Sequence, residues 1–377
     1  MKIAADWLEA PDTQKVLHLL SNAGHQALAV GGCVRNALLG LPVTDIDIAT
    51  SARPETVIAL AEAAGLRAVP TGLAHGTVTL VHNGQGFEIT TFRRDLASDG
   101  RHAEVAFSDD LREDAARRDF TMNALYLRAD GTVLDPLGGI ADLHARRVRF
   151  VGSPEDRIHE DYLRILRFFR FHAQYGDPQA GIDADALAAC ASGAEGIARL
   201  SAERIGAEMR KLLAARDPAP AVAAMAQAGV LGHVLPGADA RALAPLVHLE
   251  AGLSPRWLRR LLVLGGDVAR LRLTRQESRA WDKARAALGT MQPSAELGYH
   301  LGAELGADVA LARASLLEMP LPEDWQAEIA RGAEARFPLR ARDLPHLQGP
   351  ELGAKLKELE ARWIASDFRL SREALLA

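Results

Sequence analysis

Two aspartates stand one residue apart in the segment Asp45-Ile46-Asp47-Ile48. In a β-strand alternate side chains share a face, so both carboxylates would project together while both isoleucines point into a core. Adjacent carboxylates repel each other, and a divalent cation such as Mg²⁺, which prefers hard oxygen ligands, relieves that repulsion. The pattern predicts that Asp45 and Asp47 bind Mg²⁺; the alternative is a solvated edge strand that carries two acids.

A glycine turn lies just upstream, where Gly31-Gly32 precede Arg35. The apolar residues 28–30 predict a strand before the turn, and the residues after it predict a short helix. Backbone N–H groups at such a turn favour phosphate, and Arg35 in the first helical turn would reach a triphosphate. A Gly-Gly turn alone is most often only a turn, but together with the aspartates it indicates metal-assisted nucleotidyl transfer.

A third carboxylate is usual in sites that hold two metal ions. Glu88, on the predicted strand Phe87–Phe92, would join Asp45 and Asp47 if its strand lies beside theirs. Glu88 is therefore the best candidate for a third catalytic carboxylate, and the alternative is an exposed acid on a strand.

The charged residues Arg117-Arg118-Asp119 abut the apolar segment 120–125. This arrangement predicts charges at the mouth of a fold instead of far out on its surface. Arg117 or Arg118 would bind phosphate, and Asp119 would accept a hydrogen bond from a ribose hydroxyl. The alternative is an ordinary cluster of charges at the start of a helix.

Asp161, Arg164 and Arg167 are spaced three residues apart in a predicted helix over Glu160–Phe171. This spacing places them on one helical face, and taken alone it favours a ladder of salt bridges within the helix. The alternative is a fixed Asp–Arg pair that recognises a base. Arg donates hydrogen bonds to cytosine or adenine, and Asp accepts one from the exocyclic amine.

The elements that would position these residues change character near Pro154. Before it, residues 25–150 predict a mixed α/β unit, and after it the pattern is helical to the end. The elements predicted in the first part are helices over 11–25 and 54–65, a hairpin of Thr77–Val81 with Phe87–Phe92, and strands Val133–Asp135 and Val148–Phe150. In the helical part, Ser201 predicts the N-cap of a supporting helix within Leu200–Glu208, and Gly349-Pro350 predicts another helix start.

The composition favours several domains rich in helix. A chain of 377 residues with 48% hydrophobic residues predicts about two to four domains. The net charge of −5 argues against indiscriminate nucleic-acid binding but permits a local basic groove. The chain has no uncharged apolar run of about 18 residues and no signal-peptide pattern, and its only cysteines are Cys33 and Cys190. We therefore expect no membrane segment and a reducing, cytoplasmic location.

Together these motifs resemble the class II tRNA nucleotidyltransferases, the CCA-adding enzymes of the DNA polymerase beta superfamily. The resemblance covers about residues 25 to 215 and keeps the family's motif order. Gly-Gly-x-Val-Arg followed by Asp-x-Asp matches the first motif, and Arg117-Arg118-Asp119 matches the ribose-recognition motif. Glu160-Asp161-x-x-Arg164 matches the motif that selects the incoming base with protein side chains, so the resemblance outweighs the salt-bridge interpretation of this segment.

The resemblance implies template-independent addition of C, C and A to the 3′ end of tRNA from CTP and ATP, with release of pyrophosphate. It implies an α/β nucleotidyltransferase head with a DNA polymerase beta-like mixed sheet, followed by an all-helical neck, body and tail. We expect the head at 1–150, the neck at 151–215, the body at 216–300 and the tail at 301–377, with neck, body and tail helices that measure the acceptor stem and TψC arm of tRNA. The residues implied to contact CTP or ATP are Gly32, Arg35, Arg118, Asp161, Arg164, Arg167 and Arg170.

Two departures from the family pattern keep alternatives open. Asn36 follows the motif arginine where the family usually has Asp, and the flexible loop at 93–107 lacks the family's typical Tyr and Arg-Arg-Pro. Within enzymes, the alternatives are a CC-adding or A-adding specialist and a bacterial poly(A) polymerase. A non-catalytic tRNA-binding protein is the alternative from another class, although such a protein would be expected to lose one of the paired aspartates.

Overall fold

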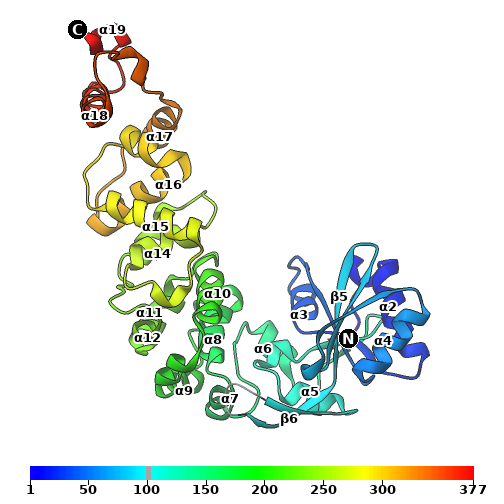
Figure 1. Cartoon of the computed structure of the whole chain (residues 1–377). Helices are drawn as coiled ribbons and strands as arrows, with labels where there is room; N and C mark the ends of the chain where they lie inside the picture. The colour runs from blue at the N-terminus through cyan, green and yellow to red at the C-terminus, as the bar shows by residue number, and fades with distance from the viewer. Residues whose placement is uncertain (99–102) are drawn as a thin grey trace. The chain divides into compact units, whose positions relative to one another are not determined.

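The structure, a computed structural model, describes residues 1–98 and 103–377. It divides into two compact units, Met1–Val234 and Leu235–Ala377. The first unit holds a β-sheet with helices followed by a helical part, and the second unit is helical (Figure 1). Among the described residues, no helix combines the length and the apolar character needed to cross a lipid bilayer.

A seven-stranded sheet forms the centre of the α/β part, with the strand order β3-β4-β5-β2-β1-β8-β9. Its neighbouring strands pair antiparallel except for β2 and β5, which run parallel. The strands are β1 (Ala27–Val30), β2 (Ile46–Thr50), β3 (Arg67–Gly72), β4 (Thr77–His82), β5 (Gln85–Thr91), β8 (Tyr126–Leu127) and β9 (Val133–Leu134).

The central pair of strands confirms the predicted alternation. Ile46 and Ile48 are buried, whereas Asp47 between them is exposed. Asp47 is the direct partner of Glu88 in the parallel register of β2 and β5, so the two predicted strands are neighbours. Strand β2 begins at Ile46, which leaves Asp45 as the residue immediately before it.

Helices α2 (Pro11–Asn22) and α4 (Pro54–Ala63) pack against the sheet. Both predicted helices are confirmed, although each ends before the predicted position. Each begins with a proline, whose fixed backbone angle suits the first helical turn. The other helices of this part are α1 (Asp6–Glu9), α3 (Gly32–Leu38), α5 (Leu111–Ala116) and α6 (Gly139–His144).

The predicted hairpin is confirmed as β4 and β5, but the strand predicted at Val148–Phe150 is wrong. Phe150 makes only an isolated bridge to Phe120. Its ring packs 5.0 Å from the Phe120 ring and 5.6 Å from the Phe168 ring, measured between centroids. The apolar residues of this segment therefore serve an aromatic core instead of a strand ladder.

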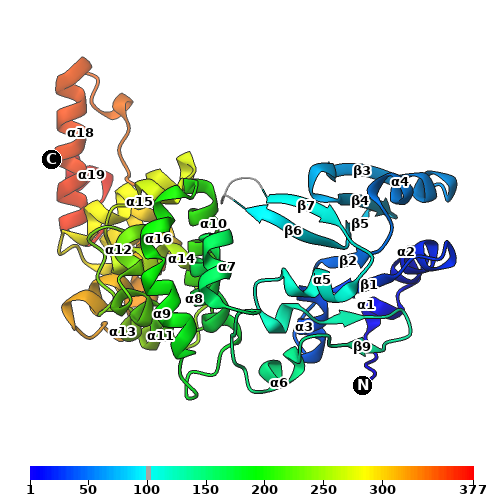
Figure 2. The same cartoon turned by 90° about the horizontal axis from the view of Figure 1, so that it is seen from below.

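Strands β6 (Arg93–Ser98) and β7 (Ala103–Phe107) pair antiparallel as a separate two-stranded ribbon (Figure 2). The two strands occupy 93–98 and 103–107, within the segment 93–107 that the resemblance assigns to a flexible loop. Residues 99–102, within the predicted loop, lie outside the described residues.

The helical part of the first unit begins with α7 (Pro154–Glu160) and α8 (Leu163–Tyr175), so the single helix predicted over 160–171 is wrong. Asp161 adopts extended backbone angles, φ −155° and ψ 106°, and ends α7. Its carboxylate then accepts a hydrogen bond from the Leu163 amide at 3.1 Å and caps the start of α8. The remaining helices are α9 (Ala184–Ser192), α10 (Ala202–Leu213), α11 (Ala219–Gln227) and α12 (Val230–Val234).

The predicted supporting helix is α10. The Ser201 hydroxyl accepts a hydrogen bond from the Arg204 amide, which confirms Ser201 as its N-cap. Helix α10 packs against α8, and this contact carries several of the polar side chains discussed below.

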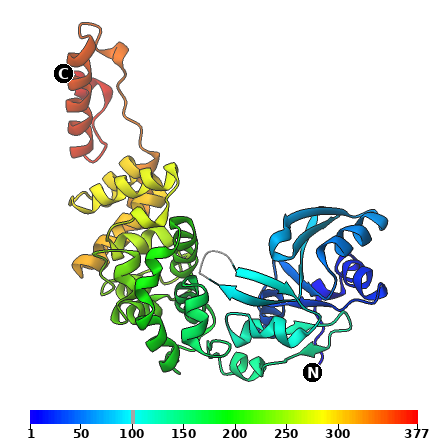
Figure 3. The same ribbon diagram turned by 60° about the horizontal axis from the view of Figure 1, so that its bottom comes forward.

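The second unit consists of α13 (Leu243–Leu249), α14 (Trp257–Leu264), α15 (Arg275–Leu288), α16 (Ser294–Leu317), α17 (Trp325–Glu334), α18 (Gly349–Ala365) and α19 (Arg372–Leu376). Between α17 and α18 the chain runs as an extended connection with only a short 3₁₀ turn, Ala341–Asp343 (Figure 3). Helix α18 begins at Gly349 with Pro350 in its first turn, as predicted.

A buried ion-pair cluster joins α13, α14 and α16. The Glu250 carboxylate lies 2.8 Å from Arg260 Nη2 and 3.3 Å from Arg259 Nε. Arg259 Nε also lies 3.1 Å from Asp308, which in turn pairs with Arg256 at 3.0 Å. Glu250, Arg259, Arg260 and Asp308 are each less than 5% exposed. These charges are stable inside the unit only because they neutralise one another.

Both cysteines are buried as free thiols. Burial raises the pKa of Cys33, on α3, to about 11. Burial also raises the pKa of Cys190, on α9. Neither thiol is therefore ionised near neutral pH, and both act as small apolar side chains.

Candidate active site

A hollow of about 450 Å³ in the first unit gathers most of the residues that the sequence singled out. Its lining draws on the turn before α3, the start of β2, the segment after α5, and helices α8 and α10. The predicted residues in the lining are Gly31, Gly32, Arg35, Asp45, Asp47, Arg118, Asp119, Arg167 and Arg170. The predicted residues outside it are Glu88, Arg117, Asp161 and Arg164.

The two aspartates lie in this hollow, and Glu88 on the neighbouring strand is the direct partner of Asp47. Loss of water around the carboxylate within the hollow, followed by the nearby charge of Glu88, raises the pKa of Asp47 to about 6. Arg118 opposes this shift in part, and Asp45 adds to it. A cation bound between the carboxylates would remove this repulsion, and three oxygen-donor side chains suit a hard divalent ion. Within residues 1–98 and 103–377, however, no three carboxylate, histidine or cysteine side chains are already arranged as a metal cluster. The residues that fit the ion best are therefore the pair Asp45 and Asp47. Glu88 lies beside Asp47 on the neighbouring strand β5 but outside the lining of the hollow.

The glycine turn leaves open space beside two guanidinium groups. Gly31 has a positive φ of 71°, which side chains with a Cβ rarely adopt. A Cβ on Gly31 would stand 3.5 Å from Arg118 Nη1, and one on Gly32 would stand 3.8 Å from Arg35 Nη2. The absence of side chains at the turn thus keeps a space that a phosphate group could fill between two cationic donors.

Arg118 is held in place by a buried carboxylate. Arg118 Nη2 donates to Asp114 at 2.9 Å, and Arg118 Nε donates to the Tyr126 hydroxyl at 3.0 Å. Arg117 pairs with the same Asp114 at 3.0 Å, which directs its side chain away from the hollow. Of the two predicted phosphate ligands in this segment, Arg118 is therefore the better placed.

Asp119 is engaged on both carboxylate oxygens. Arg167 donates to Oδ2 through Nε at 2.7 Å and through Nη2 at 2.5 Å, while Asn123 Nδ2 donates to Oδ1 at 2.8 Å. Burial alone would raise the Asp119 pKa, but Arg167 and these hydrogen bonds outweigh it and lower the pKa. Asp119 is thus a fixed acceptor at the edge of the hollow, as a ribose contact requires.

Arg170 is anchored by α10. Its Nε donates to the Glu208 carboxylate at 2.6 Å, and Arg167 Nη1 lies 3.9 Å from the same carboxylate. Glu208 is 5% exposed. The predicted supporting role of the segment 200–208 therefore has a physical basis, because α10 orients the arginines of α8.

Asp161 and Arg164 do not pair with each other. Asp161 Oδ2 accepts a hydrogen bond from Arg204 Nη2 at 2.6 Å. Arg164 pairs with Glu160 at 2.6 Å and donates to the backbone carbonyl of Arg117 at 3.1 Å. The break before α8 separates the two side chains that a continuous helix would have placed on one face, so the predicted Asp161–Arg164 ladder is absent.

Further residues line the hollow although the sequence did not single them out, among them Asn123, Tyr175 and Lys211. Asn123 lies in the apolar segment that follows the predicted charged cluster, and its polar amide there was a usable signal. Tyr175 closes α8, and Lys211 lies in the last turn of α10, where lysine is common for local reasons. No local pattern distinguishes these two residues from similar residues on other helices.

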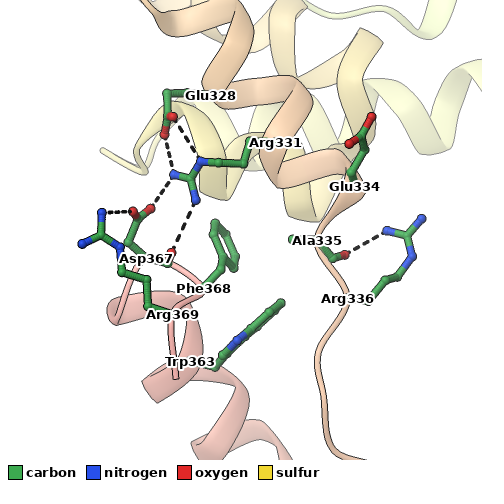
Figure 4. A pocket seen from close by; sticks show the side chains of 9 residues that line it. All are labelled: Glu328, Arg331, Glu334, Ala335, Arg336, Trp363, Asp367, Phe368 and Arg369. Atoms are coloured by element: carbon green, nitrogen blue, oxygen red, sulfur yellow. Dashed lines mark hydrogen bonds and ion pairs between the residues drawn. The ribbon is translucent and has the colours of Figure 1, made fainter. Parts of the chain in front are cut away.

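A second hollow, of about 740 Å³, lies in the second unit (Figure 4). Arg331 on α17 pairs with Glu328 and with Asp367, each at 2.5 Å, while Trp363 and Phe368 pack beside it. These charges largely neutralise one another and connect α17 with the end of α18. The hollow is therefore better explained as a structural joint than as a reaction site.

Family models match two segments of the chain. Residues 27–149 match the Poly A polymerase head domain, and residues 181–241 match the probable RNA and SrmB- binding site of polymerase A. The first match covers the sheet and the glycine turn. The second covers α9, α10, α11 and α12.

Similar proteins extend over most of the chain. A mitochondrial CCA tRNA nucleotidyltransferase 1 from Mus musculus is 32% identical, covering 98% of this chain and 92% of the relative. A CCA-adding enzyme from Geobacillus thermodenitrificans is 36% identical, covering 81% and 78% respectively. The crystal structure of the Bacillus stearothermophilus CCA-adding enzyme in complex with CTP matches with a TM-score of 0.74 at 29% identity, covering 94% of this chain and 92% of that one.

These matches confirm the predicted fold class, a nucleotidyltransferase head with a mixed sheet followed by helices. They also confirm the resemblance drawn from the sequence motifs. The chain belongs to the family of CCA-adding enzymes, which are tRNA nucleotidyltransferases.

Proposed function

We propose that this chain adds C, C and A to the 3′ end of tRNA from CTP and ATP and releases pyrophosphate. The observation that carries the proposal is the hollow of the first unit, which places a pair of aspartates beside a glycine turn and several arginines. Similarity to CCA-adding enzymes over nearly the whole chain supports it. Solved CCA-adding enzymes of the same fold hold CTP, ATP or tRNA.

In this mechanism the tRNA 3′-hydroxyl attacks the α-phosphate of the nucleotide in line, and pyrophosphate leaves. Arg35, Arg118 and the Gly31-Gly32 turn bind the triphosphate, and Asp119 accepts a hydrogen bond from the ribose. CCA-adding enzymes depend on a divalent metal, and we propose Mg²⁺ because the available donors are carboxylate oxygens. Mg²⁺ held by Asp45 and Asp47, with Glu88 nearby, would lower the pKa of the attacking hydroxyl and stabilise the leaving group.

Base selection is proposed for the helical neck. Asp161 and Arg164 would choose cytosine twice and adenine once, supported by Arg167 and Arg170 on α8. In the present arrangement Asp161 is paired with Arg204 and Arg164 with Glu160, so both would exchange partners when they contact a base. Arg117 is proposed to act through Asp114, which it shares with Arg118.

We further propose the division into head (1–150), neck (151–215), body (216–300) and tail (301–377). Body and tail would bind the acceptor stem and TψC arm of tRNA. Two free, buried cysteines fit a reducing compartment, and we propose the cytoplasm.

The deciding experiment incubates the purified protein with tRNA that lacks its 3′ end, Mg²⁺, and CTP, ATP or both, and reads the products at single-nucleotide resolution. Growth by C-C with CTP alone and by C-C-A with both nucleotides is expected. A stop at C-C would mean a CC-adding specialist with an altered 93–107 segment. Addition of A alone would mean an A-adding specialist. A long A ladder would mean a poly(A) polymerase, and no product would favour a tRNA-binding protein.

Metal affinity is expected to fall as the pH drops below about 6. The raised Asp47 pKa means that Asp47 holds a proton below this pH in the metal-free protein, and Mg²⁺ must displace it. Below the pKa the apparent affinity should fall by about tenfold per pH unit, whereas above it the affinity should level off. Calorimetric titration of Mg²⁺ between about pH 5 and pH 8 measures this dependence. An affinity that stays constant over the whole range would contradict it.

Arg164→Ala is expected to loosen base selection more than it weakens triphosphate binding. Discrimination of CTP and ATP against GTP and UTP should fall by about 10- to 100-fold, because the variant lacks the donor that distinguishes the base edges. Competition assays with mixed nucleotides measure the ratio of kcat/KM values. Arg199→Ala is the matched control, since Arg199 is an exposed neighbour that stacks on Tyr162. Unchanged selection in Arg164→Ala would argue against selection by this side chain.

A further inference from the structure

Another hollow of the second unit, of about 430 Å³, lies beside the C-terminal half of α16. One wall is the face of α16 that carries Ala310, Arg313 and Ala314, and the opposite wall is the loop before α17. Residues 291–294, at the start of α16, close a third side. None of the residues proposed for nucleotidyl transfer lines this hollow, so any role that it has is a separate one.

Arg313 keeps this hollow open. Its Nη1 donates to the Gln292 backbone carbonyl at 2.8 Å, and its Nη2 donates to the Ala287 backbone carbonyl at 2.9 Å. The guanidinium group therefore ties α16 to the end of α15 and to the residues that precede α16. Because the walls are fixed by hydrogen bonds, the hollow is preformed, as binding sites usually are.

Large apolar side chains are exposed around the hollow. Met291 is 69% exposed, Leu317 50% and Met319 49%, and we call these three residues the apolar rim. Met291 and Met319 belong to the lining. Leu317 follows Ala310 by seven residues and Ala314 by three, so it extends the helical face that forms one wall. Exposed apolar side chains that gather at one place, with methionine among them, are typical of surfaces that bind partners.

Unpaired carboxylates flank the apolar rim. Glu318, Glu323 and Asp324, which we call the acidic rim, bracket the apolar residues 319–322 in the chain, and all three are exposed. None of them forms an ion pair with any residue that the structure describes. Nucleic-acid phosphates are repelled by such charges, whereas Lys and Arg side chains are attracted. The surface therefore suits a basic protein segment, and tRNA binding by the tail is left to other faces.

The loop 319–324 is a poor edge for a partner strand. Pro320 and Pro322 have no backbone N–H group, and residues two apart present their backbone groups on the same side of an extended chain. A strand placed there would find no ladder of donors. A bound segment must therefore satisfy its own backbone hydrogen bonds, which an α-helix does.

We propose that the hollow, the apolar rim and the acidic rim form a docking site for an amphipathic helix of another protein. The apolar face of that helix would fill the hollow and cover the apolar rim. Lys or Arg side chains beside this face would pair with the acidic rim. The inference is independent of the proposed function, because no residue placed in the candidate active site takes part.

A defined peptide tests the docking site on the full chain. The probe has about 16 residues, long enough to form a helix, with leucines on one face, lysines beside that face and a fluorescent label. In the control probe every lysine is replaced by glutamate. Fluorescence anisotropy should show saturable binding of the lysine peptide with a micromolar Kd, and the glutamate peptide should bind about tenfold more weakly or worse.

Two double variants locate the binding. Leu317→Gln with Met319→Gln removes apolar surface, and Glu323→Lys with Asp324→Lys reverses the charge; each pair should weaken binding of the lysine peptide by about tenfold or more. All four side chains are exposed, so the fold should be retained. Leu73→Gln is the matched control, since Leu73 is a leucine of the first unit that is 45% exposed, and it should leave the Kd unchanged.

Several results would overturn the inference. The first is equal affinity for both peptides or no saturable binding, and the second is wild-type affinity in both double variants. The third is loss of tRNA affinity in the variant with Leu317→Gln and Met319→Gln, because this face would then serve RNA. The fourth, from sedimentation velocity, is a dimer of the wild-type protein that the same variant abolishes, because a second copy would then cover the face.

Discussion

Asp45→Ala is expected to abolish nucleotide incorporation while tRNA binding stays at the wild-type level. The variant loses one of two paired carboxylates, and with it the means to hold a cation beside the triphosphate. The rate should fall by about 10³-fold or more. Asp45 is exposed and accepts a single side-chain hydrogen bond, from Thr44 at 3.0 Å, so the fold should be unaffected.

Single-turnover incorporation of CTP into truncated tRNA measures the rate, and filter binding of the same tRNA measures affinity. Glu62→Ala is the matched control, because it removes an exposed acid from α4, away from the hollow. It should retain full activity. Normal incorporation by Asp45→Ala would refute the assignment of the metal site.

Glu250→Ala is expected to destabilise the second unit by about 3–5 kcal/mol. Glu250 lies between two buried arginines, Arg259 and Arg260, and its removal leaves them without their shared counter-charge. Asp308 compensates Arg259 only in part because it also serves Arg256. The loss should therefore exceed that of an ordinary large-to-small change at the same site.

Urea unfolding followed by tryptophan fluorescence measures this effect, since four of the five tryptophans lie in the second unit: Trp257, Trp281, Trp325 and Trp363. Glu304→Ala provides the control from the same cluster. The Glu304 side chain is 73% exposed and pairs with Arg256 at the surface. Its removal should therefore lower the free energy of unfolding by less than about 1 kcal/mol. Equal shifts in both variants would contradict the role of the buried cluster.

Local patterns were sufficient to predict the strands and the turn that carry the candidate catalytic residues. The alternation of Ile46 and Ile48 with the aspartates identified β2, and the hairpin signal downstream identified β4 and β5. The pairing of β2 with the strand of Glu88 was only a condition in the sequence analysis, and the structure supplies it. Glycines, arginines and aspartates with strict spacing carry most of the lining of the hollow. These features depend on backbone geometry near each residue, so a sequence reveals them.

The break at Asp161 could not be predicted in the same way. No proline or glycine marks it, and the helical periodicity continues from α7 into α8. The break is stabilised by the Asp161–Arg204 pair, which joins residues far apart in the chain, and by the cap on Leu163. Tyr175 escaped prediction for a related reason, because its hydroxyl accepts a hydrogen bond from Arg35 in a distant segment.

The strand predicted at Val148–Phe150 is an error of the opposite kind. The local pattern was recognised correctly, but it was not sufficient to form a strand. Alternating apolar residues suit a strand, yet a strand also needs a partner along its whole length. Here the partner is a single residue, Phe120, and the ring of Phe150 joins a cluster with Phe168. Tertiary packing decided the outcome.

The two buried thiols have a practical consequence for spectroscopy. Maleimide and iodoacetamide reagents attack accessible thiolates, and neither Cys33 nor Cys190 offers one in the folded protein. A single cysteine introduced on the surface would therefore take a fluorophore or spin label selectively, without prior removal of the native cysteines. The wild-type chain is in this sense a ready scaffold for following tRNA engagement in real time.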